Sequence, residues 1–364
     1  MYNVSNIMLI IYAIVIVAGG TTYLVFYLKQ QQKAIKIIMI VVSSFVLIAS
    51  ILCMLILNNA GFIGKKNKPQ DYPTDQNQQS VSMGVSEHWD YVGTIYFGSY
   101  PQTCVNDSSL IYELNGLSNS YINGRGYYKY KGHEYAKLTA TPYSDDYCFK
   151  SQYPVVEGEN YWFYVEPICW RVFEKNDDIF YVADVILDTL AFDSSKSAYL
   201  LNNKRIEPNN YEYSDIREWL NYGFCQYAFN YDELDQVQSY FVINEDCYED
   251  ESNNDYCCNN TRDVAWLLSL KEVEEINNYN RSNINEYLEA TDYSVAKGIE
   301  LSHISYGYEI CVNYSSWWLR SPAPSNMSSS IDYSKCANIV DYDGTIYLQY
   351  IGSSYGVRPV ICLK

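Results

Sequence analysis

Histidine is scarce in this chain: there are three among 364 residues, His88, His133 and His303, all in polar stretches. No two cysteines are spaced as Cys-x-x-Cys, so a zinc site of cysteine and histidine ligands is poorly supported. No serine, histidine and aspartate can be read as a catalytic triad, and no glycine-rich phosphate loop is present. These absences argue against a zinc enzyme, a serine hydrolase and a phosphate-loop protein.

Acidic residues are absent from the first 68 positions, which carry six lysines. The other 296 residues hold the remaining 19 basic residues and all 43 acidic ones, a net charge of −24. So acidic a region repels phosphate backbones, which argues against nucleic acid as a partner, while cationic partners and metal ions stay compatible. The 40 tyrosines indicate either a contact-making surface or the composition of an AT-rich genome.

Two charge-free stretches dominate the N-terminal region, 22 residues at 7–28 and 21 residues at 37–57. Each is long enough to span a hydrocarbon core of about 30 Å at about 1.5 Å per residue. The first stretch has neither a basic n-region nor a small-residue cleavage site, so a retained helix is favoured over a signal peptide. We therefore predict a hairpin of two transmembrane helices within residues 1–68, which makes the chain an integral, multi-pass protein of the cell membrane.

The lysines do not decide the orientation of this hairpin, because those in the connector and those after the second span nearly balance. The cysteines are more informative: of 11, Cys53 lies in the second span and ten lie in the soluble part. An even number of dispersed cysteines is typical of an oxidising compartment, although some can be small buried apolar residues. We therefore expect the bulk of the chain to be extracytoplasmic, with disulfides.

Composition divides the remainder into a polar linker at 69–90 and a globular domain at 91–364, for which the patterns predict a mixed α+β fold. Helices are expected to start after Ser214, with a break near Gly223, and after the capping-box serine Ser269. Residues 103–160 read as an irregular insertion, and 246–255 as a solvated acidic loop. Strands are expected at 93–102, 161–173, 179–187, 263–268, 337–340, 345–350 and 357–363. Two hairpins are predicted among them, one around Asn176-Asp177-Asp178 and one with the turn Asp343-Gly344.

The stretch Ser316-Trp-Trp-Leu-Arg-Ser-Pro322 is the strongest core signal, because large aromatic side chains bury the most apolar area. Related runs at 167–172 and 356–360 also place an arginine among apolar residues. A guanidinium is tolerated there only if acids or carbonyl groups saturate it. We therefore assign a structural core role to Trp170, Arg171, Trp219 and Arg358. A rival reading makes Trp317, Trp318 and Arg320 a ligand-binding set.

Several ordered motifs resemble the bacterial domain of unknown function 6273 family, from about residue 93 to the end. They are Phe97-Gly-Ser-Tyr-Pro-Gln102, Pro167-Ile-x-Trp-Arg-Val172, Ile186-Leu-Asp188, Ile216-Arg-x-Trp-Leu-Asn221 with Ala228-Phe229, Trp317 to Pro322, and Gly356-Val-Arg-Pro359. The resemblance implies an exported or membrane-anchored bacterial surface protein. It also implies the C-type-lectin-like superfold shared with formylglycine-generating enzymes.

Two sharper chemical readings follow from short motifs. Glu207-Pro208-Asn209 matches the tripeptide with which mannose-type C-type lectins hold calcium and sugar, but it lies in a polar loop outside the family motifs, and coincidence is favoured. Cys311 and Cys336 flank the double-tryptophan strand, as a redox pair of a formylglycine-generating enzyme could, yet buried or disulfide-bonded cysteines explain them more simply. We predict no metal centre, and calcium is the one cation these motifs suggest.

The sequence as a whole predicts a membrane-anchored extracytoplasmic binding domain without catalytic activity. Its partners are expected to be the membrane and an extracellular glycan or protein ligand. A formylglycine-generating-like or other redox enzyme is the first alternative, and a structural surface protein is the second. Fold alone does not decide among them.

Overall fold

The computed structural model describes residues 88–195, 197–244, 258–279, 287–302, 313–323 and 331–364. These residues belong to one compact unit, Ser82–Lys364. They form a strand-rich α+β domain with few helices, which confirms the predicted fold class at this level. The two predicted membrane spans lie outside the described residues. Within the described part, no helix is both long enough and apolar enough to cross a membrane.

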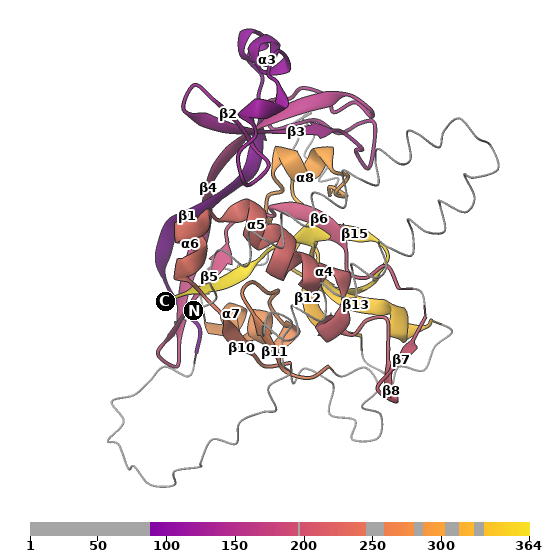
Figure 1. Cartoon of the computed structure of the whole chain (residues 1–364). Coiled ribbons are helices and arrows are strands. Elements are labelled where there is room, and N and C mark those ends of the chain that lie inside the picture. Colours follow the sequence, from indigo (N-terminus) through magenta and orange to yellow (C-terminus); the bar gives the residue numbers. More distant parts are fainter. Residues whose placement is uncertain (1–87, 196, 245–257, 280–286, 303–312, 324–330) are drawn as a thin grey trace, which may run out of the picture. The chain divides into compact units, whose positions relative to one another are not determined.

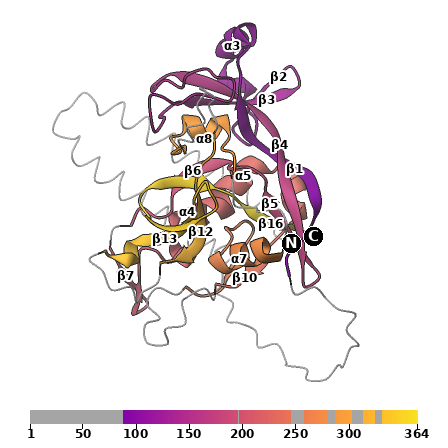
Figure 2. The ribbon, with the colours of Figure 1, turned by 180° about the vertical axis from the view of Figure 1, so that it is seen from behind.

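The larger sheet has seven strands and is organised around the long strand β4 (Asn160–Lys175). Its path runs β2-β3-β4-β5-β16-β9, and β1 (Asp90–Cys104) pairs antiparallel with β4 off this path. In both views β1 and β4 run together from the body of the domain to the end that carries β2, β3 and α3 (Figures 1 and 2). The other strands are β2 (Tyr128–Tyr130), β3 (His133–Thr139), β5 (Asp178–Ala183), β9 (Val237–Gln238) and β16 (Val360–Leu363).

The predicted hairpin after β4 is confirmed. Lys175 pairs with Asp178, and the two residues between them, Asn176 and Asp177, both have positive φ, at 51° and 66°. This conformation is the two-residue turn whose twist matches that of the flanking strands, and asparagine and aspartate tolerate it better than most residues. The turn therefore projects from the end of the sheet with a fixed register.

A second sheet has five strands in the order β14-β13-β12-β15-β6. Its centre is β12 (Trp317–Pro322), in which every residue is buried, and which pairs antiparallel with β13 (Cys336–Val340) and parallel with β15 (Ser354–Val357). The predicted Asp343-Gly344 turn joins β13 to β14 (Ile346–Tyr350), and Gly344 has φ +85°. The two edge strands are β14 and β6 (Asp188–Ala191).

One predicted strand is divided between the two sheets. Residues 357–363 were expected to form a single strand, but β15 ends at Val357 in the five-stranded sheet and β16 begins at Val360 in the larger one. Pro359 has no N–H for a ladder, which suits a crossing point between sheets. The strand predicted at 263–268 is also mostly wrong, because β11 (Thr261–Asp263) ends at Asp263. Beyond that residue, Trp266 makes an isolated bridge to Val360.

The predicted helix after Ser214 begins as expected, because the Ser214 hydroxyl accepts from the backbone N–H of Arg217. It does not break at Gly223. Instead α4 (Asp215–Glu218) continues into a π-helical turn, η3 (Trp219–Phe224), and then α5 (Cys225–Ala228). A Cβ at Gly223 would lie 2.8 Å from the Trp219 ring, so glycine admits the ring there.

The remaining helices are short. Helix α6 (Tyr231–Gln236) has an Asn230–Glu233 capping box, α7 (Leu270–Tyr279) follows Ser269 as predicted, and α8 (Asp292–Ala296) is capped by Thr291. Two two-stranded sheets complete the fold. They are β7 (Tyr199–Leu201) with β8 (Lys204–Ile206), and β10 (Tyr240–Val242) with β11; single 3-10 turns occur at η1 (Asn119–Tyr121), η2 (Tyr211–Tyr213) and η5 (Tyr333–Lys335).

The segment 103–160 is not the irregular insertion that its composition indicated. It contains α3 (Ser108–Asn115), β2 and β3, and its Val105, Leu114 and Tyr135 form a small separate core with Trp162 of β4. Tyrosine-rich strands supply this core because tyrosine combines a large apolar ring with a polar tip. The segment therefore extends the larger sheet.

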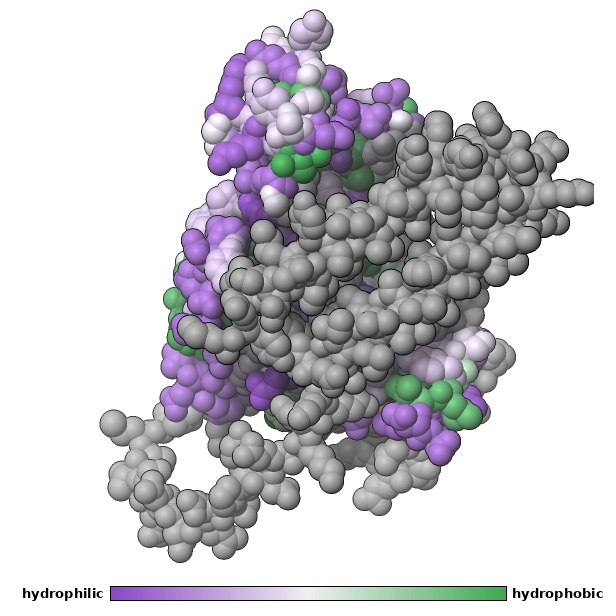
Figure 3. All heavy atoms as spheres, in the orientation of Figure 1, coloured by the Kyte–Doolittle hydropathy of each residue, from purple (hydrophilic) through white to green (hydrophobic). Residues whose placement is uncertain are grey.

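The main core contains all five fully buried tryptophans, Trp89, Trp170, Trp266, Trp317 and Trp318. Trp89 is 2% exposed, so packing begins before the predicted domain start at residue 91. Where described residues are visible in Figure 3, most of the surface is hydrophilic, as the acidic composition leads one to expect.

Candidate functional site

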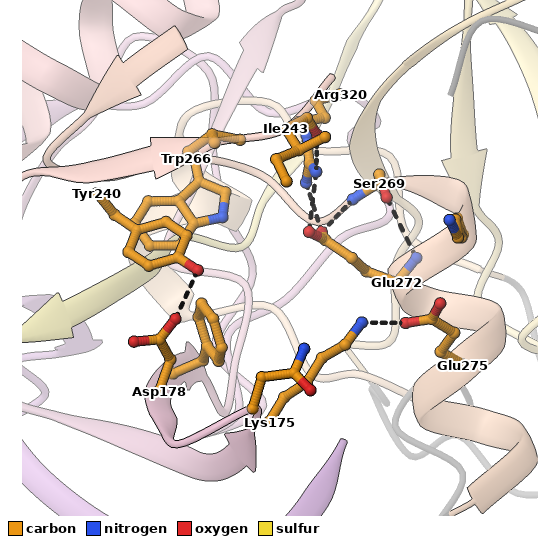
Figure 4. A pocket seen from close by; sticks show the side chains of 13 residues that line it. Lys175, Asp178, Tyr240, Ile243, Trp266, Ser269, Glu272, Glu275 and Arg320 are labelled. Carbon is orange, nitrogen blue, oxygen red and sulfur yellow. Dashed lines mark hydrogen bonds and ion pairs between the residues drawn. The ribbon is translucent and has the colours of Figure 1, made fainter. Parts of the chain in front are cut away.

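A groove of about 200 Å³ lies beside the β4–β5 turn, β10 and the start of α7 (Figure 4). Four segments that are distant in sequence line it, since residues 175–180, 240–243 and 266–275 meet Arg320 of β12 there. We call it the Tyr240 groove. Its lining residues are Lys175, Asn176, Asp178, Phe180, Tyr240, Val242, Ile243, Trp266, Ser269, Lys271, Glu272, Glu275 and Arg320.

One wall of the Tyr240 groove is aromatic. The Tyr240 ring stacks on Trp266 at 5.4 Å and 16°, and Phe180 meets Tyr240 edge-on at 5.2 Å. The Tyr240 hydroxyl donates to Asp178 at 2.9 Å, so the hairpin turn fixes the ring. Burial, and then the hydrogen bond to Asp178, raise the pKa of Tyr240, so the phenol remains a hydrogen-bond donor well into the alkaline range. The wall therefore offers a rigid apolar face with polar groups at its edge.

The floor of the groove is built on Arg320, which is 4% exposed. Its Nε donates to Asn244 Oδ1 at 3.0 Å, while its Nη atoms donate to the backbone oxygens of Leu267 and Ile243 at 2.8 and 2.9 Å. Both Nη atoms also bind the Glu272 carboxylate in a bidentate pair. These five hydrogen bonds use all five donors of a guanidinium.

Glu272 reaches Arg320 because the N-terminus of α7 orients it. The Ser269 hydroxyl accepts from the Glu272 N–H at 3.1 Å, and Glu272 Oε2 accepts from the Ser269 N–H at 2.8 Å. This is the reciprocal capping box that the sequence predicted. The same carboxylate thus caps the helix and neutralises the arginine, so β12 and α7 are joined through one side chain.

A second ion pair closes the groove beside the start of β1. Glu275 Oε2 accepts from Lys175 Nζ at 2.5 Å and from Trp89 Nε1 at 3.1 Å. Lys175 Nζ also lies 5.4 Å from the centre of the Trp89 ring. With Arg320 and Lys175 both paired, Lys271 is the lining cation for which the described residues supply no ion pair. The groove is therefore close to neutral, with its charges held in fixed positions.

The structure places Trp317 and Trp318 away from this surface, because both are fully buried. Trp318 Nε1 donates to the Leu190 oxygen at 2.9 Å and its ring meets Tyr355 at 5.1 Å. Both rings pack in the main core, and neither lines the Tyr240 groove. Arg320 lines the groove, but its donors are occupied by the protein.

The four residues assigned to the structural core are not equally buried. Trp170 is fully buried and donates to the Phe97 oxygen at 2.8 Å, whereas Trp219 is only partly buried and packs against the core. Arg171 pairs with Asp184. Arg358 is fully buried, donates to the Ala183 oxygen at 2.8 Å and lies 4.9 Å from the centre of the Trp317 ring.

The electrostatics of Arg358 differ from those of Arg320. Burial, and then the charge of nearby Arg171, lower the pKa of Arg358 to about 9, and Asp184 opposes that change. The cation is therefore held in an unfavourable environment that carbonyl and aromatic contacts offset. Arg358 belongs to the junction of the two sheets.

The Glu207-Pro208-Asn209 turn makes hydrogen bonds and an ion pair within the protein. Asn209 Nδ2 donates to the backbone oxygens of Tyr333 and Cys336 at 3.1 and 3.0 Å, and Glu207 pairs with Arg205. Across the described ranges, no group of three or more histidine, cysteine, aspartate or glutamate residues is arranged to hold a metal ion. The acidic loop at 246–255 lies outside the described residues.

Most cysteines of the described part are free thiols. This corrects the expectation that the cysteines of the soluble part generally form disulfides. Cys148 is disulfide-bonded, but no disulfide joins two described cysteines. Burial raises the pKa of the Cys336 thiol, the opposite of what a redox nucleophile needs. Cys311 lies outside the described residues. The free thiols are Cys104, Cys169, Cys225, Cys258, Cys336 and Cys362.

Sequence reasoning missed the residues that shape the groove. Tyr240 is one of 40 tyrosines, and nothing in its local pattern distinguishes it. Lys175 and Asp178 were visible only as the ends of a hairpin turn. The capping box at Ser269 was the one available signal, because it placed Glu272 at the start of a helix. Nothing local placed Glu272 beside Arg320, which lies 48 positions away in sequence.

No curated protein and no solved structure matches this chain. One family model matches residues 183–364, a range that starts later than the resemblance read from the motifs. It covers β6, the helices after Ser214, the five-stranded sheet and most of the Tyr240 groove, whereas β1 to β4 lie outside it. The chain belongs to the family described as Domain of unknown function (DUF6273).

Proposed function

We propose that this protein is a membrane-anchored, extracytoplasmic binding domain without catalytic activity, and that the Tyr240 groove holds its ligand. The observation that carries the proposal is the preorganisation of the groove. Its aromatic wall is fixed by the Tyr240–Asp178 hydrogen bond, and its charged groups are fixed by two ion pairs. Binding to rigid groups loses less conformational entropy than binding to mobile ones.

The lining favours a small ligand that has both an apolar face and hydrogen-bonding groups. Such a ligand can stack on Tyr240 and contact Asn176 and Lys271 at the rim. A groove of about 200 Å³ is smaller than the pockets of drug-sized ligands, so it suits one sugar ring or one peptide side chain. An extracellular glycan or protein ligand meets this description.

The anchoring and the fold are parts of the same proposal. The charge-free stretches at 7–28 and 37–57 support two membrane spans. The Trp/Arg strand and the Gly-x-Arg strand support a C-type-lectin-like superfold, as the family resemblance implies. An experimental structure whose strand order could not be superimposed on that superfold would reject this part of the proposal.

A binding screen of the full chain in detergent micelles, on glycans and peptides together, tests the function. We expect at least one saturable ligand whose affinity falls about tenfold or more in Tyr240→Ala, because a stacked aromatic contributes roughly 1 kcal/mol beyond its buried area. Tyr231→Ala is the matched control, since Tyr231 is 89% exposed and does not line the groove. Ligands that bind both variants equally well would place the site elsewhere.

A further inference from the structure

A second cavity, of about 290 Å³, lies over the five-stranded sheet and shares no residue with the Tyr240 groove. Asp341 follows β13, Ser316 precedes β12, and Tyr355 belongs to β15, so adjacent strands bring these residues together. We call it the acidic cavity. Its described lining residues are Glu300, Leu301, Ser302, Ser316, Ile339, Asp341, Tyr342, Gln349 and Tyr355.

The charged side chains among the described lining residues of this cavity are all acidic. Glu300 and Asp341 are acidic, and none of its described lining residues is lysine, arginine or histidine. The Tyr240 groove, by contrast, has its carboxylates balanced by lysine and arginine. Two carboxylates with no cation among the described lining residues create a negative potential that attracts a positively charged ligand.

Asp341 presents one oxygen for such a ligand. Its Oδ1 already accepts from Ser316 Oγ at 2.5 Å and from the Tyr342 N–H at 2.9 Å. Its Oδ2 accepts no hydrogen bond from the described residues. The two donors on Oδ1 fix the orientation of the carboxylate, so the second oxygen is held in place.

Glu300 and Tyr355 face the same space. Burial, and then the charges of Glu300, Tyr143 and Asp341, raise the pKa of Tyr355 to about 12. Glu300, Asp341 and Tyr355 all line this cavity. The Tyr355 ring is held edge-on against Trp318 at 5.1 Å, which makes this wall of the cavity rigid.

Ser302 adds an unsatisfied group. Its Oγ is buried and has no hydrogen-bond partner among the described residues, and the residue lines the cavity. A buried hydroxyl without a partner is unfavourable, and a ligand that donates a hydrogen bond to it removes that penalty. The cavity thus presents acceptors on Asp341, Glu300 and Ser302 together with apolar walls from Leu301 and Ile339.

We propose that the acidic cavity binds an aliphatic primary ammonium group, carried by a lysine side chain of a peptide or by a free small amine. An ammonium has three N–H donors for the three acceptors, and its methylene stem suits apolar walls. Calcium fits less well, because it takes about six to eight oxygen ligands. The volume, just below the usual range for drug-sized ligands, suits a single side chain.

The test is calorimetric titration of the full chain in detergent micelles at low salt. The probes are n-butylamine, N-acetyl-lysine methylamide, the uncharged isostere N-acetyl-norleucine methylamide, and calcium chloride. We expect one or both ammonium probes to bind and the norleucine probe not to bind. If both ammonium probes bind, a free amine is enough for recognition. If only the lysine derivative binds, the site also recognises the peptide groups that carry the side chain.

Two variants locate the binding. Asp341→Asn and Glu300→Gln should each weaken ammonium binding about tenfold or more, because each removes a charge-assisted hydrogen bond. Asp343→Asn is the matched control: it removes the same charge from the same hairpin but does not line the cavity, and binding should persist. Equal binding of the norleucine probe, a preference for calcium, or equal losses in Asp343→Asn would each overturn the proposal.

Discussion

Some side chains in this domain have more than one structural role, and Arg320 and Glu272 are the clearest case. Glu272 caps α7 and pairs with Arg320, and Arg320 ties β12 to the strand and loop that border the groove. Removing either partner leaves the other as a buried charge without compensation, which is more harmful than the loss of a surface ion pair.

Arg320→Ala should lower the free energy of unfolding by about 3–5 kcal/mol, because Glu272 and two backbone oxygens lose their donors. Arg320→Lys should also destabilise the domain, since an ammonium cannot reproduce the planar fork. Thermal or urea unfolding of the full chain measures both. An unchanged melting temperature in Arg320→Ala would contradict a structural role for Arg320. It would make Arg320 the first residue to examine for ligand contact.

The buried thiols give a second prediction at this scale. Burial raises the pKa of Cys104, Cys225 and Cys362 to about 12 each, so few thiolates exist at pH 8. Native-state alkylation by iodoacetamide should be at least about 100-fold slower than in denaturant, as mass spectrometry of labelled peptides can measure. A described cysteine that reacts as fast as a free thiol would favour the redox-enzyme alternative.

At the scale of elements, β12 connects the parts of the domain. It pairs with β13 and β15, its Trp318 reaches β6 through a hydrogen bond, and its Arg320 reaches α7. Helix α8 makes a comparable junction at the other end of the domain, where Asp292 Oδ2 accepts from the Cys104 N–H at 2.9 Å and Oδ1 from the Lys150 N–H at 2.8 Å.

Trp318→Ala and Trp170→Ala should each lower the free energy of unfolding by about 3–5 kcal/mol, because each removes a fully buried indole and leaves a cavity. Tyr222→Ala serves as the control, since Tyr222 is 74% exposed and should change stability little. Chemical denaturation of the three variants compares them. Near-normal stability of both tryptophan variants would show that these rings are not core residues.

The α8 junction predicts a pH dependence. Burial raises the pKa of Asp292 above its ordinary value of 3.8, although two backbone N–H groups oppose the change. An acid with a raised folded-state pKa binds more protons when folded, so its contribution to stability falls as the pH rises above about 3.8.

Asp292→Asn removes this titration while keeping one side-chain oxygen for the N–H donors. The stability of the wild type minus that of the variant should therefore become smaller as the pH rises from about 3.8 towards neutrality. Urea unfolding at a series of pH values measures the difference. A difference that grows with pH would mean that the hydrogen bonds outweigh burial and that the pKa is lowered.

At the scale of the whole molecule, charge and hydropathy are separated along the chain. The first 68 residues carry six lysines, no acid and two long apolar runs, while the remainder has a net charge of −24. This separation is the basis for proposing a membrane anchor joined to a soluble domain. The proposed orientation of the anchor rests on the number of cysteines in the soluble part, because the lysines nearly balance.

An impermeant protease tests that orientation. Digestion of intact cells should remove the domain that contains residues 88–364, because the linker predicted to precede it is polar and expected to be open to proteases. A cytoplasmic protein serves as the control for cell integrity. Cleavage that occurs only after lysis would reverse the proposed topology.

Several features followed from the sequence alone because their causes are local. The Asn176-Asp177 turn, the Asp343-Gly344 turn, the Ser214 cap and the Ser269 capping box each depend on residues within a few positions of one another. The burial of Trp317 and Trp318 and the internal pairing of Arg320 also followed, since a large ring or a guanidinium inside an apolar strand permits few alternatives.

Other features were decided by contacts between distant segments. The division of residues 357–363 between two sheets depends on what lies beside β15 and β16, and the order found in 103–160 depends on pairing with β4. Tyr240 forms a groove wall only because Asp178 and Trp266 meet it, 62 and 26 positions away. Asp341 and Glu300 share a cavity for the same reason. Local pattern fixes turns, caps and buried faces, whereas a site that is assembled from several segments exists only once the chain has packed.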